Sequence, residues 1–180
     1  SGAATVGPKR CAASEAAFDL NAPPAFSGWG LDPASTHSIP AEVSGLSRAN
    51  APKLKLKWAL GFPNALRARS QPTIAGGAMF VGSHNGMVYA LDIKTGCARW
   101  TYQASSEVRT GIVVSPWTAG DKKAQPLAFF GDIVGGTYAV NALTGDEARI
   151  AGDELFQGLL WRGGLLCGRQ WARRGVGGES

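Results

Sequence analysis

Histidine, methionine and cysteine are scarce in this sequence of 180 residues, and charged residues make up only 17% of it. The three cysteines, Cys11, Cys97 and Cys167, show no Cys-x-x-Cys spacing. That absence excludes the usual sequence patterns of a zinc site and of a thioredoxin-type redox motif. Because the number of cysteines is odd, at least one thiol stays outside any intramolecular disulfide.

Long apolar runs are also missing. No stretch approaches the roughly 20 consecutive apolar residues that a membrane-spanning helix needs, so the sequence predicts no membrane span. The chain begins SGAATVG, without a methionine and without a basic segment followed by an apolar one. We therefore expect a processed or excised segment in which no signal peptide is present.

Glycine and short apolar runs are abundant. The sequence contains 25 glycines and is 44% hydrophobic. Its β-branched and aromatic runs are separated by Gly, Pro, Asn and Asp, a pattern that predicts an all-β fold of short strands joined by turns. The net charge of +5 includes Lys53, Lys55 and Lys57, which would share the solvated face of a strand. No aromatic-rich basic surface accompanies them, so nucleic-acid binding is not predicted.

Two segments repeat one another in a single register, and they end at Gly96 ("NGMVYALDIKTG") and at Gly145 ("GGTYAVNALTG"). The matched positions, all with the same spacing, are Phe80 and Phe129, Gly82 and Gly131, Gly86 and Gly135, Tyr89 and Tyr138, Ala90 and Ala139, Leu91 and Val140, Asp92 and Asn141, Thr95 and Thr144, and Gly96 and Gly145. A period of about 40 to 50 residues is typical of propeller blades or of another repeat array.

Each repeat predicts an antiparallel blade: a strand MFVG, a tight turn HNG, a strand MVYALD, a turn KTG and a strand CARWTYQ. Trp58 precedes Trp100 by nearly one repeat, which predicts the outer strand of a preceding blade. The predicted organisation is an extended segment at 1–53, a propeller region at 54–150 with an outer strand at 54–60 and four-stranded blades at 72–102 and 111–150, and an atypical tail at 151–180.

The motif "VYALDIKTGCARW" resembles the repeat of propellers that bind pyrroloquinoline quinone (PQQ), in which a Tyr-Ala-Leu-Asp strand, a Thr-Gly turn and a following Trp recur. Together with "FSGWGLDPASTHS", it is similar to the amino-terminal part of quinoproteins of the polyvinyl-alcohol dehydrogenase type. The resemblance covers about residues 26–145. It implies that the chain is a PQQ-type β-propeller fragment, with about two blades of an expected eight.

The resemblance also implies the chemistry of the whole protein. It implies a periplasmic quinoprotein alcohol dehydrogenase that uses PQQ and calcium to oxidise a secondary alcohol and passes the electrons to a cytochrome c-type acceptor. Some family members carry haem on a Cys-x-x-Cys-His motif. Here Ser14 and Glu15 stand where the second Cys and the His of that motif would follow Cys11, so haem is not expected.

Two Arg-hydroxyl pairs recur at one place in successive repeats, namely Arg69-Ser70 before "QPTIAGG" and Arg109-Thr110 before "GIVV". Each pair precedes an expected innermost strand, so both would lie at the mouth of the central channel. Arginine offers a planar pair of donors to a carboxylate, and PQQ is a tricarboxylate. We therefore predict that these four residues bind the cofactor; the alternative is that the arginines only satisfy loop carbonyls.

No catalytic residue or metal ligand is assigned. His84 and His37 have the sequence surroundings of turn residues, and the repeated positions Asp92 and Asn141 are typical of residues that cap a Thr-Gly turn. In the family that the chain resembles, the catalytic Asp and the calcium ligands lie in later blades. They have no matching positions in this sequence.

One disulfide is considered, between Cys11 and Cys97, which would suit an oxidising periplasm; the alternative is that both are buried free thiols.

From residue 151 onward the strand alternation stops, and a shifted reading frame or an artificial end would produce such a tail. Two blades alone leave open edges and an uncovered sheet face. We therefore expect a marginally stable, inactive chain that is able to associate with itself through its open edges. A separate alternative is a self-contained small β domain, in which four two-blade copies would close a ring. A different class of function remains open: a propeller scaffold without cofactor, such as an outer-membrane assembly lipoprotein.

Overall fold

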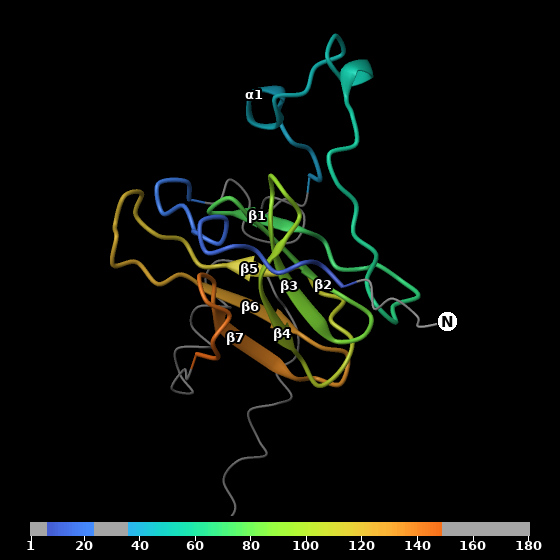
Figure 1. Ribbon diagram of the computed structural model, residues 1–180, viewed down its shortest axis with the longest axis vertical. Helices are drawn as coiled ribbons and strands as arrows, with labels where there is room; N and C mark the ends of the chain where they lie inside the picture. The colour runs from blue at the N-terminus through green and yellow to red at the C-terminus, as the bar shows by residue number, and fades with distance from the viewer. Residues whose placement is uncertain (1–6, 24–35, 149–180) are drawn as a thin grey trace, which may run out of the picture. The chain divides into compact units, whose positions relative to one another are not determined.

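The computed structural model describes residues 7–23 and 36–148 (Figure 1). Its elements are α1 (Ala41–Ser44), a 3-10 turn (Ala51–Lys53), β1 (Thr73–Ala75), β2 (Ala78–Gly82), β3 (Met87–Asp92), β4 (Ala98–Gln103), β5 (Val113–Val114), β6 (Leu127–Gly131) and β7 (Thr137–Asn141). The predicted all-β fold is confirmed, since the described residues contain only two helical segments, of four and three residues.

The strands form two antiparallel sheets, ordered β1-β2-β3-β4 and β5-β6-β7 (Figure 1). The predicted repeat is visible in the strand register. Phe80 pairs with Ala90 between β2 and β3, and Phe129 pairs with Ala139 between β6 and β7. The sheets are therefore two copies of one unit, as expected for successive propeller blades.

Trp100 on β4 joins the first sheet to the second. Its indole Nε1 donates a hydrogen bond of 3.0 Å to the carbonyl of Ala142, and its ring covers Gly145. A Cβ added to Gly145 would lie only 2.8 Å from that ring, and the backbone there has a φ of 80°, so glycine is required at this turn on both grounds. The ring is almost fully buried in the core that both sheets share.

Trp58 repeats this arrangement on the first sheet. Its Nε1 donates to the carbonyl of Ile93 at 3.2 Å, and its ring covers Gly96. The strand predicted at 54–60 is nevertheless not formed within the part of the chain that the structure describes, because no neighbouring strand pairs with this segment. The sequence predicted the position of Trp58 correctly but not the missing pairing.

The inner strands of the two sheets are joined as well. The hydroxyl of Thr73 donates to the carbonyl of Ile112 at 2.5 Å, just before β5. The two sheets are thus bonded to each other near their innermost strands and again at Trp100, on β4. This double attachment holds the loops between the sheets in fixed positions.

Asp92 caps the turn after β3, as the sequence predicts. Its carboxylate accepts hydrogen bonds from the backbone N–H groups of Lys94 and Thr95 and pairs with Arg99 at 2.7 Å. Burial alone would raise the pKa of Asp92, but the bonds from Arg99 and the turn outweigh it and hold that pKa below its ordinary value. The amide of Asn141 caps the equivalent turn of the second sheet.

The amino-terminal segment is attached to the outside of the first sheet. Cys11 and Cys97 form the disulfide that the sequence raised as a possibility, with their Cα atoms 5.0 Å apart. Next to it, Arg10 forms a parallel bridge with Ala98 at the free edge of β4. Further along, the ring of Phe18 lies directly over Gly76. The predicted tail at 151–180 lies outside the described residues, and the predicted limits of the blades stay predictions.

We expect Trp100→Ala to lower the free energy of unfolding by about 3–5 kcal/mol, because it removes a buried aromatic ring and leaves a cavity between the sheets. Chemical denaturation followed by circular dichroism measures this loss. The control is Leu66→Ala at an exposed position, which should change stability by less than about 0.5 kcal/mol. Equal effects of the two substitutions would contradict the joining role of Trp100.

We expect Cys11→Ser to lower the free energy of unfolding by about 2–4 kcal/mol, because the disulfide closes a long loop of 86 residues in sequence. Dithiothreitol should destabilise the wild-type protein by a similar amount and leave the stability of the variant unchanged. A wild-type protein whose denaturation midpoint is insensitive to dithiothreitol would show that the bond does not support the fold.

Candidate functional site

The loops that precede the inner strands meet the β2-β3 turn at one end of the sheets. Here the backbone N–H of Val108 donates to the carbonyl of Ser83 at 3.1 Å. The N–H of Ile133, in the β6-β7 turn, donates to the carbonyl of Glu107 at 3.0 Å. Residues from both sheets are therefore gathered at this end, which we call the loop end.

Ser70 and Thr110 have equivalent positions at the loop end. The Ser70 hydroxyl accepts a hydrogen bond from the N–H of Gly82 at 3.0 Å and donates to the carbonyl of Thr110 at 2.8 Å. The Thr110 hydroxyl makes a pair of bonds, at 3.2 Å each, with the N–H and the carbonyl of Gly131. The Thr110 hydroxyl thus fixes the backbone of its own blade, and the Ser70 hydroxyl joins its own blade to the next. These bonds position the arginine that precedes each residue.

Glu107 is the residue at this end that the sequence analysis missed. Its side chain is only 6% exposed, and its Oε2 atom accepts a hydrogen bond of 2.8 Å from Nη2 of Arg109. The same Oε2 atom lies 3.8 Å from Nε2 of His84, in the β2-β3 turn. A break in the repeat could have indicated this residue, because the equivalent position of the preceding blade is occupied by Arg67.

The charges of the loop end favour an ionised Glu107. The hydrogen bond from Arg109 lowers the pKa of this carboxyl most strongly, and burial opposes that effect. The positive charges of Arg109 and Arg69 lower the pKa further. In return, the bond to Glu107 raises the pKa of the Arg109 guanidinium. Arg109 binds this carboxylate and Arg69 acts on it through its charge, so positive charge exceeds negative charge here and would attract an anion.

Arg109 and Arg69 differ in how firmly they are held. Arg109 is 41% exposed, and one of its terminal nitrogens is fixed by Glu107, so its remaining donors are available to a ligand. Arg69 is exposed and interacts with Glu107 only through its charge. The structure therefore places Arg109 on the Glu107 carboxylate, whereas Arg69 acts on that carboxylate only through its charge.

Asp132 has a structural role at the same end. Its carboxylate accepts hydrogen bonds from the hydroxyl of Tyr138 at 2.8 Å and from the N–H groups of Gly136 and Val134 at 2.7 and 3.1 Å. Burial would raise the pKa of Asp132, but these bonds lower it below its ordinary value. A further backbone bond comes from Ser106, in the loop after β4, so Asp132 holds the hairpin together and attaches it to that loop.

No group of three His, Cys, Asp or Glu side chains is arranged to hold a metal ion in the ranges 7–23 and 36–148. Among the same residues, no helix is long and apolar enough to cross a membrane. His37 lies in the exposed segment before α1, where its backbone φ is 51°.

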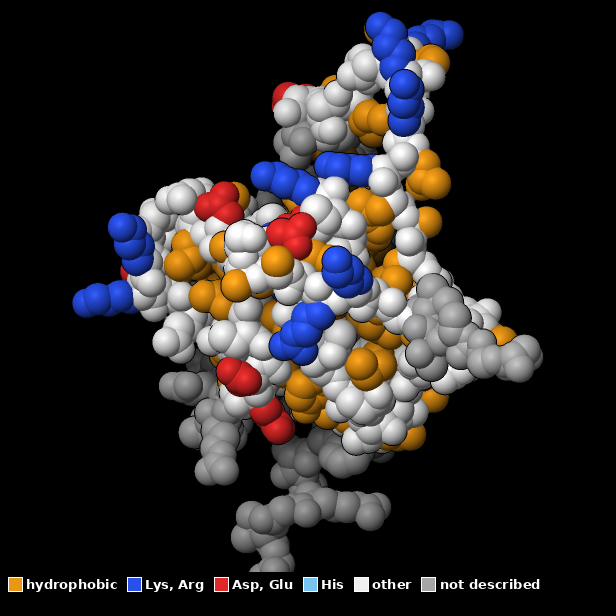
Figure 2. Space-filling view, viewed as in Figure 1, with side chains coloured by type: hydrophobic (Ala, Val, Ile, Leu, Met, Phe, Trp, Pro, Cys, Tyr) orange, Lys and Arg blue, Asp and Glu red, His pale blue; other side chains and the backbone are white. Residues whose placement is uncertain are grey.

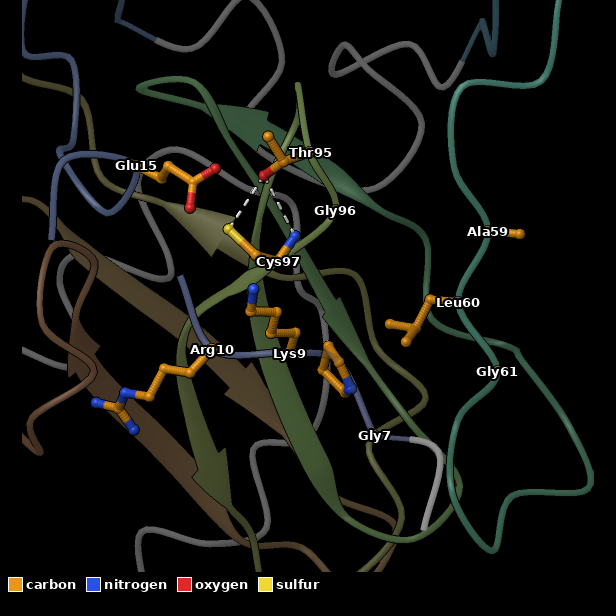
Figure 3. Close-up of a pocket in the computed structure, with 11 residues that line it drawn as sticks. Gly7, Lys9, Arg10, Glu15, Ala59, Leu60, Gly61, Thr95, Gly96 and Cys97 are labelled. Atoms are coloured by element: carbon orange, nitrogen blue, oxygen red, sulfur yellow. Dashed lines mark hydrogen bonds between the residues drawn. The ribbon is translucent and has the colours of Figure 1, made fainter. Parts of the chain in front are cut away.

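A pocket of about 380 Å³ lies at the opposite end of β3, beside the disulfide (Figure 3). Its lining includes three glycines together with Lys9, Arg10, Glu15 and Thr95. None of the residues that the sequence predicted for cofactor binding lines it. The loop end, with its buried carboxylate and paired arginine, is the better candidate for a functional site because its charged groups are fixed by contacts with one another.

We expect Glu107 to contribute to stability in a pH-dependent way. Its pKa in the folded state is lowered, so the contribution is present above the ordinary glutamate pKa of about 4.3 and is lost as the pH falls through the lowered value. Urea denaturation of wild type and Glu107→Gln should show a wild-type advantage at pH 7 that shrinks at pH 3. An advantage that is the same at both pH values would contradict the assigned pKa shift.

Comparison with known proteins gives clear relatives, although no model of a known protein family matches the chain. The polyvinylalcohol dehydrogenase of Pseudomonas sp is 36% identical over 141 residues, which is 78% of this chain and 21% of that enzyme. The polyvinylalcohol dehydrogenase of Sphingopyxis sp. (strain 113P3) is 34% identical over 138 residues, which is 77% of this chain and 20% of that enzyme.

A more distant relative is the quinohemoprotein alcohol dehydrogenase of Comamonas testosteroni. It is 26% identical over 162 residues, which is 83% of this chain and 22% of that enzyme. The chain spans about one fifth of the length of each of these relatives. By sequence, it is a homologue of the polyvinylalcohol and alcohol dehydrogenases of the PQQ-dependent family.

Proposed function

We propose that this chain is part of a PQQ-dependent alcohol dehydrogenase and that its loop end contributes to binding the anionic cofactor. The observation that carries the proposal is the position of Arg109, whose guanidinium is fixed by the buried carboxylate of Glu107 at 2.8 Å. A fixed and partly exposed guanidinium loses little conformational freedom when it binds a carboxylate.

The sequence repeat also supports the proposed cofactor site. The hydroxyls of Ser70 and Thr110 accept bonds from equivalent backbone N–H groups in successive blades, and an arginine precedes each of them. Arg69 and Arg109 are therefore presented from equivalent positions, on neighbouring blades of one array. A ligand with several carboxylates, such as PQQ, would be able to engage both arginines at once.

The net charge of the loop end also favours an anionic cofactor. Glu107 neutralises one of the two arginines, and the excess positive charge at the loop end favours a polyanionic ligand over a neutral one. PQQ itself supplies the electron-accepting quinone when it is bound. The part played by this chain is to bind and orient the cofactor through Arg109, with Arg69 as a weaker partner.

The wider activity rests on the relatives. The names of two of them specify polyvinylalcohol as the substrate, and we extend to this protein the oxidation of a secondary alcohol. Calcium, a cytochrome c-type electron acceptor and a periplasmic location belong to the same proposal. We expect no dehydrogenase activity from this chain alone, because it spans only about a fifth of the length of the related enzymes.

We expect the chain to bind PQQ saturably, and Arg109→Ala to weaken that binding by about tenfold, the usual value of a lost charge-assisted hydrogen bond. Quenching of tryptophan fluorescence by PQQ, with and without calcium, measures the affinity. Arg69→Ala should have a smaller effect in the same direction.

The matched control is Arg67→Ala. It removes the same charge from an exposed position shortly before Arg69, so it separates a specific contact from the general attraction of a basic surface. Equal losses in Arg109→Ala and Arg67→Ala would contradict the site. A folded chain that does not bind PQQ at all would favour the scaffold function.

A further inference from the structure

His84 and Glu107 are two positions at which the loop end departs from the repeat. In the second repeat, Ile133 occupies the position equivalent to His84. In the preceding blade, Arg67 occupies the position equivalent to Glu107. A residue that every blade needs for its own structure recurs from blade to blade, whereas a residue with one task in the whole array occurs once. The two departures therefore point to a task of this site and not of the blade.

The backbone around these two residues holds them close together. The N–H of Val108 donates to the carbonyl of Ser83 at 3.1 Å, so the residue after Glu107 is bonded to the residue before His84. Gly82 permits this approach, because an added Cβ atom would collide with the side chain of Val108. The separation of the imidazole and the carboxylate is therefore constrained by the packing of the β2-β3 turn on the loop after β4.

A single carboxylate oxygen faces two basic side chains. Oε2 of Glu107 lies 2.8 Å from Nη2 of Arg109 and 3.8 Å from Nε2 of His84. The His84 side chain is 30% exposed, so protons from solvent reach it, whereas the Glu107 side chain is only 6% exposed. A positive charge on His84 would compete with Arg109 for this oxygen and weaken the hold of the carboxylate on the guanidinium.

The other charged groups of the loop end keep their charge near neutral pH. Arg69, in the loop before β1, acts on Glu107 through its charge. The carboxylate of Asp132, in the β6-β7 turn, is bonded within its own hairpin and to the loop after β4. Arginine stays protonated and such carboxylates stay ionised in this range, whereas histidine changes its charge between about pH 5 and pH 8. Among these groups, the imidazole of His84 is therefore the one that responds to pH near neutrality.

We propose that His84 belongs to the anion site of the loop end and increases its affinity for a polycarboxylate when the imidazole is protonated. The added charge offsets Glu107, so more of the positive charge of Arg109 acts on the ligand. The inference rests on the proposed function in that it takes the loop end as the anion site. Because binding equilibria are reciprocal, a ligand that prefers the protonated form must bind with uptake of a proton.

General attraction to a basic surface has to be separated from this effect. Figure 2 shows Lys and Arg side chains distributed over several parts of one face. These side chains stay protonated between about pH 5.5 and pH 8, so their attraction for an anion does not change in that range. The α-amino group does titrate there. The sequence contains two histidines, His84 and His37, and a substitution at each assigns the pH dependence.

Quenching of tryptophan fluorescence by PQQ at pH 5.5 and at pH 8 tests the proposal on the whole chain. The wild type should bind PQQ about fivefold more tightly at the lower pH, as expected for one added, partly exposed charge. His84→Asn should show the weaker affinity at both pH values. His84→Lys, which keeps a positive charge, should show the higher affinity at both.

The matched control is His37→Asn, in the exposed segment before α1, where a φ of 51° suits asparagine. It should keep the pH dependence of the wild type. Titration calorimetry in buffers of different ionisation enthalpy gives a second readout, because the wild type should take up more protons than His84→Asn when PQQ binds. The turn at His84 should tolerate both substitutions, since the equivalent turn carries Ile133, and circular dichroism checks that the variants are folded.

Inorganic sulfate, whose charge is constant in this pH range, separates the inference from the proposed function. Its binding is followed by the amide NMR signals of residues 107–110. If the wild type and His84→Asn bind PQQ with the same pH dependence, the inference is overturned while the cofactor site stands. Sulfate binding that is tighter at pH 5.5 only in chains with His84, without any PQQ binding, would support the inference and contradict the proposed cofactor. A folded chain that binds neither anion would overturn both.

Discussion

The structure depends on a tryptophan ring that lies flat over a glycine turn of the next repeat. Trp100 covers Gly145 and Trp58 covers Gly96, at distances that leave no room for a Cβ atom. Each ring also donates a hydrogen bond to the turn that it covers. This contact combines the burial of a large aromatic surface with a satisfied polar group, and it sets both the spacing and the order of the repeats. The sheets therefore stack as successive blades.

The same stacking organises the loop end. Because Trp100 fixes the outer strands and Thr73 bonds across to Ile112 near the inner ones, the loops before β1 and β5 have little freedom. Ser70 and Thr110 then hold equivalent turns of successive blades. An exposed arginine is thus presented by a rigid frame, and the buried Glu107 orients the second one. A binding site for a polyanion follows from the repeat itself, with one acidic residue added where the repeat is broken.

Much of this architecture could be predicted from the sequence. The repeat that ends at Gly96 and Gly145 predicted the strands and the turns between them, and Asp92 and Asn141 were correctly interpreted as turn caps, because these features depend on local patterns. Glu107 could not be found in that way, since its importance comes from burial and from contact with His84, a residue distant in sequence. Whether residues 54–60 form a strand depends likewise on a neighbouring strand, and the pattern of this segment alone does not encode that neighbour.

Native-state hydrogen exchange tests the central claim that the tryptophan contact couples the sheets into one cooperative unit. The account predicts that the amides of β3 and β7 open with the same free energy, because neither sheet keeps its core when Trp100 leaves the turn that it covers. If the amides of β7 exchanged through an opening of much lower free energy while β3 stayed protected, the second sheet would be a separate unit. That result would contradict the account.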